Sequence, residues 1–430
     1  MLDRTSAPPL APLAAIRIPA ARVISLSDGM TLTVVRAGDQ PLARFTAIWD
    51  GGQADLPSEA LTVLSDVLTE GAGPYSAEAL ADAVDLAGAR INTRVSDHYT
   101  GISLLGLADR LPALYPVLRE VATAPLLEER SVEVSRNRRA TSAAIRLAKV
   151  SALAADASKA AIAGEGHPYA HVETPEGFAA VTAEEVRAVY NAIFGRGRRG
   201  LHAFLTGAVT DRLLDATVRL LESLPAGESR PSPIVIRPFA PGGEDRVSPP
   251  LRHIDVPNAV QSAVSMSIPA IGRDHPDYDM LRLTVMALGG YFGSRLMSVV
   301  REREGLTYGI SANLMGLREG AYVQIDAQCS RENVEAVIAG TLRQIRELWE
   351  RPLETDETER LRLHAWSTLA ATADSPLSAG DYYQTQLLVG TPSDYFARQL
   401  RAIAALTPES VAATARTYLD RMPVIVTAGA

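Results

Sequence analysis

The chain has a single cysteine, no long hydrophobic run and no signal for export, and each absence excludes a class of protein. With only Cys329 in 430 residues, no intrachain disulfide can form, and a lone cysteine in a strand-like run is typical of a small buried side chain. No stretch approaches the roughly 18 uncharged apolar residues that a membrane span needs. Residues 1–20 lack a basic segment followed by an apolar one, so we expect a cytoplasmic protein.

Positive charge is also not concentrated anywhere along the chain. The formal net charge is −8, and no basic stripe of the kind that tracks a phosphate backbone is present. The sequence therefore argues against a nucleic-acid-binding protein. Hydrophobic residues make up 47% of the chain, which is enough for sizeable cores, and at about 100–200 residues per domain the length predicts two to four domains.

The same order of elements occurs twice, and this repeat predicts the fold class. Each half is expected to contain a strand, two helices, two strands, a helix, a long helical region, a capped helix and a final strand. The capped helices begin at Thr182 and Thr407, the first with a Thr-x-x-Glu capping box and the second with Pro408 at its first position. Strands joined by short turns indicate mostly antiparallel sheets, with helices packed on one face of each sheet.

We therefore expect an α+β protein of two homologous domains, residues 1–224 and 251–430. The joint, residues 225–250, is rich in Pro, Gly, Ser and Glu, as linkers are. Four further elements are expected: a helix with Ser58 as its N-cap, a strand over 260–268 with Val260 on its buried face, and helices over 278–290 and 294–304.

Self-contained catalytic motifs are missing. The chain has no Gly-x-Ser-x-Gly elbow, no P-loop and no dinucleotide-binding glycine pattern. Two histidines, His167 and His171, have the i, i+4 spacing of helical metal ligands. Pro168 between them favours a loop instead, so turn or surface histidines are the simpler interpretation, and a metal enzyme with this pair as ligands is the less favoured one.

Arg301 and Tyr308 form the second candidate site. A helix expected to end at Gly305 and a strand expected to begin at Tyr308 would bring a guanidinium and a phenol close together. Such a pair can bind a carbonyl oxygen or a developing oxyanion. Charged helix ends and strand tyrosines are common, so the residues alone favour an ordinary surface.

Two stretches of the second half resemble a known family. The motifs are Gly289-Gly290-Tyr291-Phe292-Gly293-Ser294-Arg295-Leu296 and Arg301-Glu302-Arg303-Glu304-Gly305-Leu306-Thr307-Tyr308. They look like the second half of the insulinase/pitrilysin-like zinc peptidases, in the branch where two chains of this size pair into one clam-shell. The resemblance covers essentially the whole chain and implies a duplicated α+β fold, in agreement with the repeat. In the family the segment around His167 is a connecting loop.

The chain departs from the family where the metal should be. Active members carry His-x-x-Glu-His on the first helix, and alignment from the strand over 45–49 puts Thr62, Ser65 and Asp66 at its histidine, glutamate and histidine positions. The third ligand, a downstream glutamate, would fall near Ser135 or Arg136. The resemblance thus implies a chain without zinc that is inactive alone.

The implied function is that of the non-catalytic subunit of a heterodimeric zinc endopeptidase that cuts small peptides. A partner of similar size would supply the zinc, while Arg301 and Tyr308 would bind substrate and stabilise the oxyanion. The precursor peptide of pyrroloquinoline quinone is one expected substrate. Residues Ile91, Asn92 and Thr93 are the expected edge strand to which a peptide would add. The alternative is a structural or peptide-binding protein of the same fold with no role in hydrolysis, and the isolated chain could form a homodimer.

Overall fold

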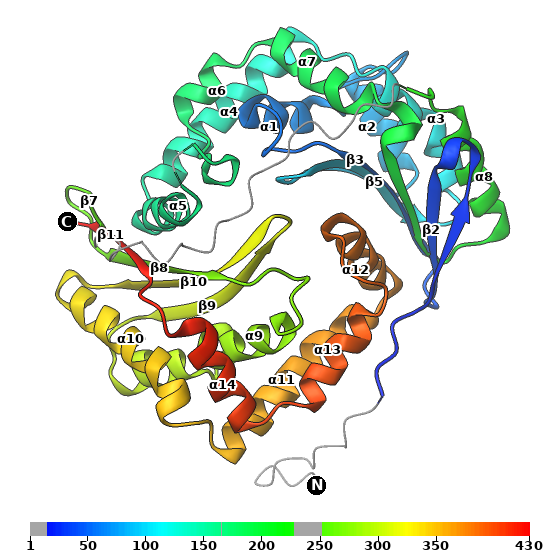
Figure 1. The fold of residues 1–430 in the computed structure, drawn as a ribbon. Helices are drawn as coiled ribbons and strands as arrows, with labels where there is room; N and C mark the ends of the chain where they lie inside the picture. Colours follow the sequence, from blue (N-terminus) through cyan, green and yellow to red (C-terminus); the bar gives the residue numbers. More distant parts are fainter. Residues whose placement is uncertain (1–14, 165, 228–251) are drawn as a thin grey trace, which may run out of the picture.

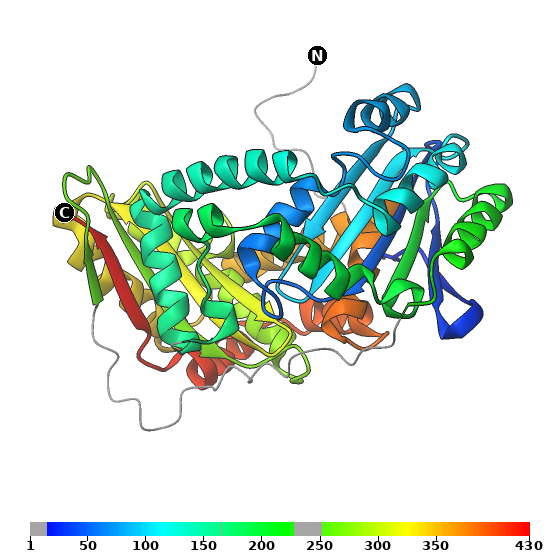
Figure 2. The same cartoon turned by 90° about the horizontal axis from the view of Figure 1, so that it is seen from above.

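The computed structural model describes residues 15–164, 166–227 and 252–430, which form two halves that face each other (Figure 1). Each half has its own sheet, and the two halves lie side by side (Figure 2). The predicted linker, residues 225–250, lies almost entirely outside the described residues. Cys329 is buried, as expected.

The first sheet has six strands in the order β1-β2-β6-β3-β5-β4. Their bounds are β1 Ala21–Ser25, β2 Thr31–Arg36, β3 Leu42–Asp50, β4 Arg90–Val95, β5 Tyr99–Leu107 and β6 Leu201–Gly207. The second sheet has the order β7-β11-β8-β10-β9. Its strands are β7 Arg252–Asp255, β8 Ser262–Ala270, β9 Gly309–Leu317, β10 Gly320–Cys329 and β11 Val424–Gly429.

The two sheets share one topology once β1 is set aside. In each, a first strand lies parallel to the last strand of its half, β2 beside β6 and β7 beside β11. All other neighbouring pairs are antiparallel. The predicted α+β fold with two homologous halves and mostly antiparallel sheets is therefore confirmed.

Fourteen α-helices lie in the described residues. Those of the first half are α1 Ser58–Val67, α2 Ala77–Leu86, α3 Leu111–Thr123, α4 Glu129–Leu147, α5 Val150–Ala163, α6 Pro175–Ala180, α7 Ala183–Phe194 and α8 Asp211–Ser223. Those of the second half are α9 Tyr278–Val285, α10 Val334–Glu350, α11 Thr355–Ala373, α12 Pro376–Val389, α13 Tyr395–Ala404 and α14 Pro408–Leu419. Thr182 and Thr407 cap α7 and α14 through their side chains, as predicted.

Four element predictions need correction. Val260 is 95% exposed and precedes β8, which begins only at Ser262. Ser58 is the first residue of α1, and its hydroxyl is bound to Glu173 instead of capping the helix. The helices expected over 278–290 and 294–304 contain the π-helical segments Met286–Gly290 and Met297–Arg303. A hydrophobic pattern does not distinguish these wider turns from α-helical ones.

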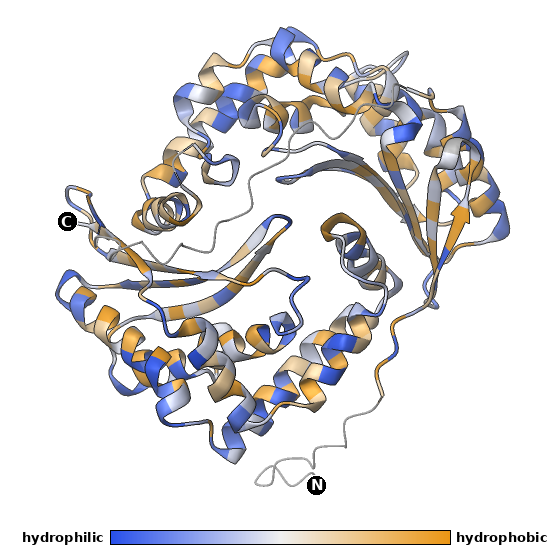
Figure 3. Ribbon diagram, viewed as in Figure 1, coloured by the Kyte–Doolittle hydropathy of each residue, from blue (hydrophilic) through white to orange (hydrophobic). Residues whose placement is uncertain are grey.

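Alternation along the strands divides each sheet into an apolar outer face and a more polar inner face. In β10, Val323, Ile325, Ala327 and Cys329 belong to the core under the helices, whereas the residues between them point the other way. The outer helices α10 and α14 show the matching pattern, with stripes of hydrophobic and hydrophilic residues (Figure 3). The inner faces are thus left for other contacts.

Each inner face is partly covered by a helix from the other half. Helix α5 of the first half packs on β8 and β11 of the second sheet, where Ala154, Ala263 and Val426 are buried together. The Ser158 hydroxyl also meets that of Ser267 at 2.6 Å. Helix α12 of the second half packs on β2 and β6 (Figure 1). The two halves are therefore joined by an exchange of helices.

Small residues make this exchange possible. A Cβ on Gly380 of α12 would lie 2.4 Å from Cγ2 of Thr206 on β6, a distance that real side chains do not reach. Beside this contact, Arg44 of β3 donates to the Asp381 carboxylate and to the carbonyl of Leu377, 3.0 Å away. Helix α12 is thus held against the first sheet by close packing and by an ion pair.

The variant Gly380→Ala tests this contact. Alanine usually stabilises a helix by about 1 kcal/mol relative to glycine, but here overpacking should lower the free energy of unfolding by about 1–3 kcal/mol. Chemical denaturation measures the change. Adding Thr206→Ser removes the clashing methyl group and should recover part of the loss. A more stable Gly380→Ala protein would show that α12 does not lie this close to β6.

Candidate functional site

The helix expected to carry the degenerate zinc motif is α1, which lies beside the edge strand β4. The Thr93 hydroxyl of β4 donates to the carbonyl of Ser65 at 2.6 Å, so helix and edge strand are tied together. Thr62 is 8% exposed. Thr62, Ser65 and Asp66 therefore lie on a helix that packs beside the edge strand of the first sheet.

Asp66 is held by groups from α4. Ser135 and the Nε of Arg139 donate to its Oδ2, each at 2.7 Å. A second Arg139 nitrogen donates to its Oδ1, and Arg138 lies 3.0 Å from the carboxylate. Burial raises the pKa of Asp66, but the hydrogen bonds from Arg139 and Ser135 and the charge of Arg139 outweigh it, so the pKa lies below its ordinary value.

Thr62 is held by a different group of side chains. Its hydroxyl donates to the Glu173 carboxylate at 2.5 Å. Gln53 and Ser58 donate to the same carboxylate oxygen, each at 3.0 Å. Glu173 is therefore a structural acceptor that ties the loop before α6 to the start of α1.

These residues do not fit a zinc ion. Zinc takes histidine, cysteine and carboxylate ligands, but the one carboxylate at the motif, Asp66, is neutralised by two guanidinium groups. Across residues 15–164, 166–227 and 252–430, no group of three or more His, Cys, Asp or Glu side chains could hold a metal ion. At this position the guanidinium of Arg139 supplies positive charge in place of a metal.

The two spaced histidines do not converge. His167 precedes a short 3₁₀ turn, and its Nδ1 accepts from the backbone N–H of Tyr169 at 3.1 Å. His171 instead lies 3.1 Å from the Glu59 carboxylate of α1. Proline inside the pair produces the loop predicted from the sequence, and the helical spacing of metal ligands is lost.

Arg301 and Tyr308 meet, but through the tyrosine backbone. The Nε of Arg301 donates to the Tyr308 carbonyl at 2.9 Å, and its guanidinium lies 5.2 Å from the centre of the Phe292 ring. Gly305, with φ of +65°, makes the turn between the π-helical segment and β9. Tyr308 and Phe292 are 84% and 66% exposed. These side chains form a surface of one cation and two aromatic rings.

Neighbouring arginines are distinguished by their contacts. Arg295 is 11% exposed in its side chain and is paired with Glu357 at 3.0 Å. It also donates to the backbone carbonyls of Glu347, Arg351 and Pro352. Arg295 therefore fixes α10 and α11 to the segment before Arg301, which leaves Arg301 as the arginine with a partly exposed guanidinium beside Tyr308.

Strand β4, expected to bind peptide, is the free edge of the first sheet. Asn92 lines a cavity of about 330 Å³ on the inner face, which Arg44 of β3 and Gln384 of α12 also line, whereas the Thr93 side chain points to the other face and binds α1. Ile91 packs against the first core. The three predicted residues are thus divided between the two faces of the strand.

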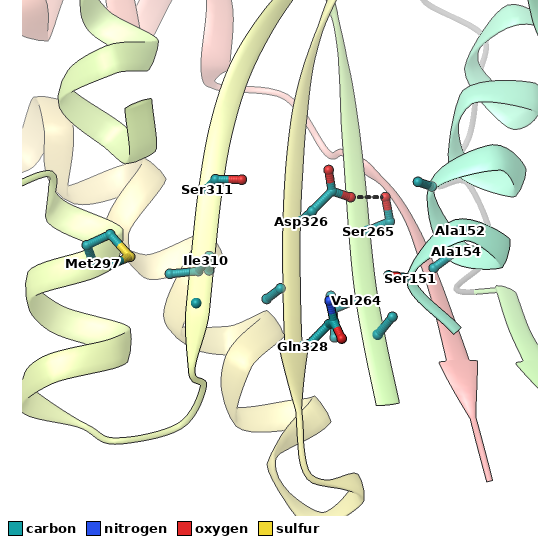
Figure 4. Close-up of a pocket in the computed structure, with 14 residues that line it drawn as sticks. Ser151, Ala152, Ala154, Val264, Ser265, Met297, Ile310, Ser311, Asp326 and Gln328 are labelled. Carbon is teal, nitrogen blue, oxygen red and sulfur yellow. Dashed lines mark hydrogen bonds between the residues drawn. The ribbon is translucent and has the colours of Figure 1, made fainter. Parts of the chain in front are cut away.

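A second cavity, of about 520 Å³, occupies the inner face of the second sheet (Figure 4). It is bounded by α5 and by β8, β9 and β10, and Met297 and Gly309 bring the Arg301–Tyr308 segment to its rim. Sequence reasoning missed this cavity. The signal was present in β10, where the polar residues Gln324, Asp326 and Gln328 alternate with apolar ones.

Comparison with known proteins shows what the chain is similar to. Residues 180–363 match the family model described as the peptidase M16 inactive domain. An uncharacterized zinc protease of Streptomyces coelicolor is 24% identical over 376 residues, which are 85% of this chain and 79% of that protein.

Two solved structures share the fold. The peptidase M16 inactive domain from Pseudomonas fluorescens is 23% identical with a TM-score of 0.81, over 95% of this chain and 98% of that one. The periplasmic protease PqqL from Escherichia coli is 16% identical with a TM-score of 0.75, over 98% of this chain but 47% of its own. No helix among the described residues is long and apolar enough to cross a membrane. The chain is thus similar to the peptidase M16 inactive domain over residues 180–363 and shares the fold of the insulinase/pitrilysin-like zinc peptidases.

Proposed function

We propose that this chain is the non-catalytic subunit of a two-chain zinc endopeptidase, in which Arg301 and Tyr308 bind the peptide substrate and stabilise negative charge. The observation that carries the proposal is a contrast between two sites. At α1 the polar groups at the motif are used internally: Asp66 by Arg139, Thr62 by Glu173, and Ser65 by the carbonyl of Thr62. At the Arg301–Tyr308 segment the phenol and part of the guanidinium are exposed.

The chemistry of the exposed pair suits a developing oxyanion. Arg301 uses its Nε to hold the Tyr308 carbonyl, so the segment is fixed while the arginine side chain stays 34% exposed. Glu302, at 3.7 Å, is a weak partner at the surface. The phenol adds a second donor. Two donors aimed at one oxygen can stabilise charge that grows as a carbonyl is attacked.

The partner would supply the metal, the water that it activates and the general base. It is proposed to be of similar size, a proposal supported by PqqL, whose chain is about twice the span matched here. Peptide would add to the edge strand β4 through main-chain hydrogen bonds, with Asn92 facing the cavity beside it. The precursor peptide of pyrroloquinoline quinone is the first substrate to test, and a cytoplasmic location remains part of the proposal.

The first prediction concerns the oxyanion pair. In a mixture with the zinc-binding partner, Arg301→Ala and Tyr308→Phe should each lower kcat about 10²–10³-fold, because each removes one donor. Peptide hydrolysis followed by mass spectrometry measures the rate. Arg303→Ala is the matched control, since Arg303 is an exposed arginine of the same segment and should leave the rate unchanged.

Full activity in both variants would contradict the proposal. It would favour the alternative, a structural or peptide-binding chain of the same fold, which predicts that partner or peptide binding persists without any effect of this pair on hydrolysis.

A second prediction tests the structural use of α1. Asp66→Asn leaves two arginines without their anion and should lower the free energy of unfolding by about 1–3 kcal/mol at pH 7. The ordinary pKa of an aspartate is near 3.9, and the pKa of Asp66 in the folded protein lies below that value. The contribution of the ionised Asp66 to the free energy of unfolding is therefore complete above about pH 5 and is lost as the pH falls below about 4. Denaturation of both proteins between pH 7 and 3 measures this difference.

The exposed Asp82 of α2 provides the control. Asp82→Asn should change stability by less than about 0.5 kcal/mol at any pH in this range. An equal effect of the two substitutions would mean that the Asp66 ion pair does not stabilise α1.

A further inference from the structure

The cavity on the second sheet has a carboxylate at its floor. Asp326 lies in the middle strand of three, with Ser265 of β8 and Ser311 of β9 as its direct cross-strand neighbours. All three side chains line the cavity (Figure 4). Ser265, Asp326 and Ser311 therefore place one carboxylate between two hydroxyl groups on the inner face of the sheet.

A hydrogen-bond network fixes one oxygen of this carboxylate. Ser265 and the amide of Gln324 donate to Oδ1 of Asp326, at 2.7 and 2.9 Å. Behind them, Ser267 donates to Gln324 at 2.9 Å, and Ser158 of α5 meets Ser267. The carboxylate is thus anchored to both halves of the molecule.

The other oxygen of Asp326 makes no hydrogen bond within the part of the chain that the structure describes, and no arginine, lysine or histidine there forms an ion pair with it. The surrounding walls are small and mostly apolar, with Ala152 and Ala154 (Figure 4) and Ala263 among them. A charge beside such walls interacts more strongly than it would in open water. A cation entering the cavity would gain a fixed carboxylate and further acceptors from Ser311 and Gln328.

We infer that this cavity binds a primary ammonium group of the peptide, with Asp326 as its counter-ion. The inference rests on the proposed function for its choice of ligand, a peptide. An ammonium is compact and has three donors, which match the carboxylate and the neighbouring oxygens. The rim formed by Met297 and Gly309 places the Arg301–Tyr308 segment next to this subsite. The site therefore selects peptides that carry positive charge near the bond to be cut.

Two sources could supply the ammonium, a lysine side chain or the peptide's own N-terminus. Four matched pentapeptides separate them: one with lysine and a free N-terminus, one with lysine and an acetylated N-terminus, one with norleucine and a free N-terminus, and one with norleucine and an acetylated N-terminus. Binding to the purified chain alone is measured by calorimetry, so that no partner or hydrolysis is needed.

The test compares wild type with Asp326→Asn, which keeps the shape and the acceptor of the side chain but removes its charge. At least one ammonium-bearing peptide should bind wild type tenfold more tightly than the doubly blocked peptide, and Asp326→Asn should abolish that difference. Asp420→Asn, a change of the same charge at an exposed residue, should not. The singly blocked peptides show which source occupies the site.

Equal binding of charged and blocked peptides by wild type, or a preference that survives Asp326→Asn in a folded protein, would overturn the inference. Neither result would bear on the role of Arg301 and Tyr308, which is measured by hydrolysis with the partner.

Discussion

The exchange of helices between the two halves is the constraint on which the rest of the structure depends. Because α5 covers part of the second sheet and α12 part of the first, neither inner face is complete without the other half. Buried alanines, Gly380 and the Ser158–Ser267 contact allow the helices to approach closely. The space that remains on each inner face lies toward the edge strands, β4 in one sheet and β9 in the other, and both cavities are found there.

The duplicated architecture places two kinds of polar site in equivalent surroundings. In the first half, α1 and β4 flank a motif whose polar groups have become internal, with Arg139 and Glu173 as partners. In the second half, the segment before β9 leaves Arg301 and Tyr308 at the surface, beside a cavity with a fixed carboxylate. The polar groups of α1 are therefore used in internal contacts, while Arg301 and Tyr308 stay exposed, which is the contrast on which the proposed function rests.

Much of the fold can be predicted from the sequence, because helix caps and the hydrophobic patterns of helices and strands are local features of the chain. Capping at Thr182 and Thr407 and the repeated order of elements predict the helices, the duplication and the mostly antiparallel sheets. The exposed Val260 and the π-helical segments were not predictable, since burial and helix width depend on tertiary packing. Helix α8 was also missed, although Thr210 is a good N-cap.

The sites were predicted less completely, for a related reason. The absence of a His-x-x-Glu-His motif is readable from the sequence, but Arg139, the partner of Asp66, lies 73 residues further along the chain. Nothing in the sequence marks that pairing. The role of Arg295 as an anchor for α10 and α11 likewise depends on carbonyls that only the fold brings together. Asp326 could have been noticed from the alternation in β10, but not its hydrogen bond to Ser265 of β8 or the network that continues through Gln324 and Ser267 to Ser158 of α5.

We propose that this chain needs a partner's metal to take part in hydrolysis. Zinc content and peptidase activity, measured on the purified chain alone and after mixing with the zinc-binding partner, test it most directly. We expect the purified chain to hold far less than one zinc per chain and to hydrolyse no peptide by itself. Activity is expected only in the mixture. One tightly held zinc per chain together with hydrolysis by the isolated chain would contradict it.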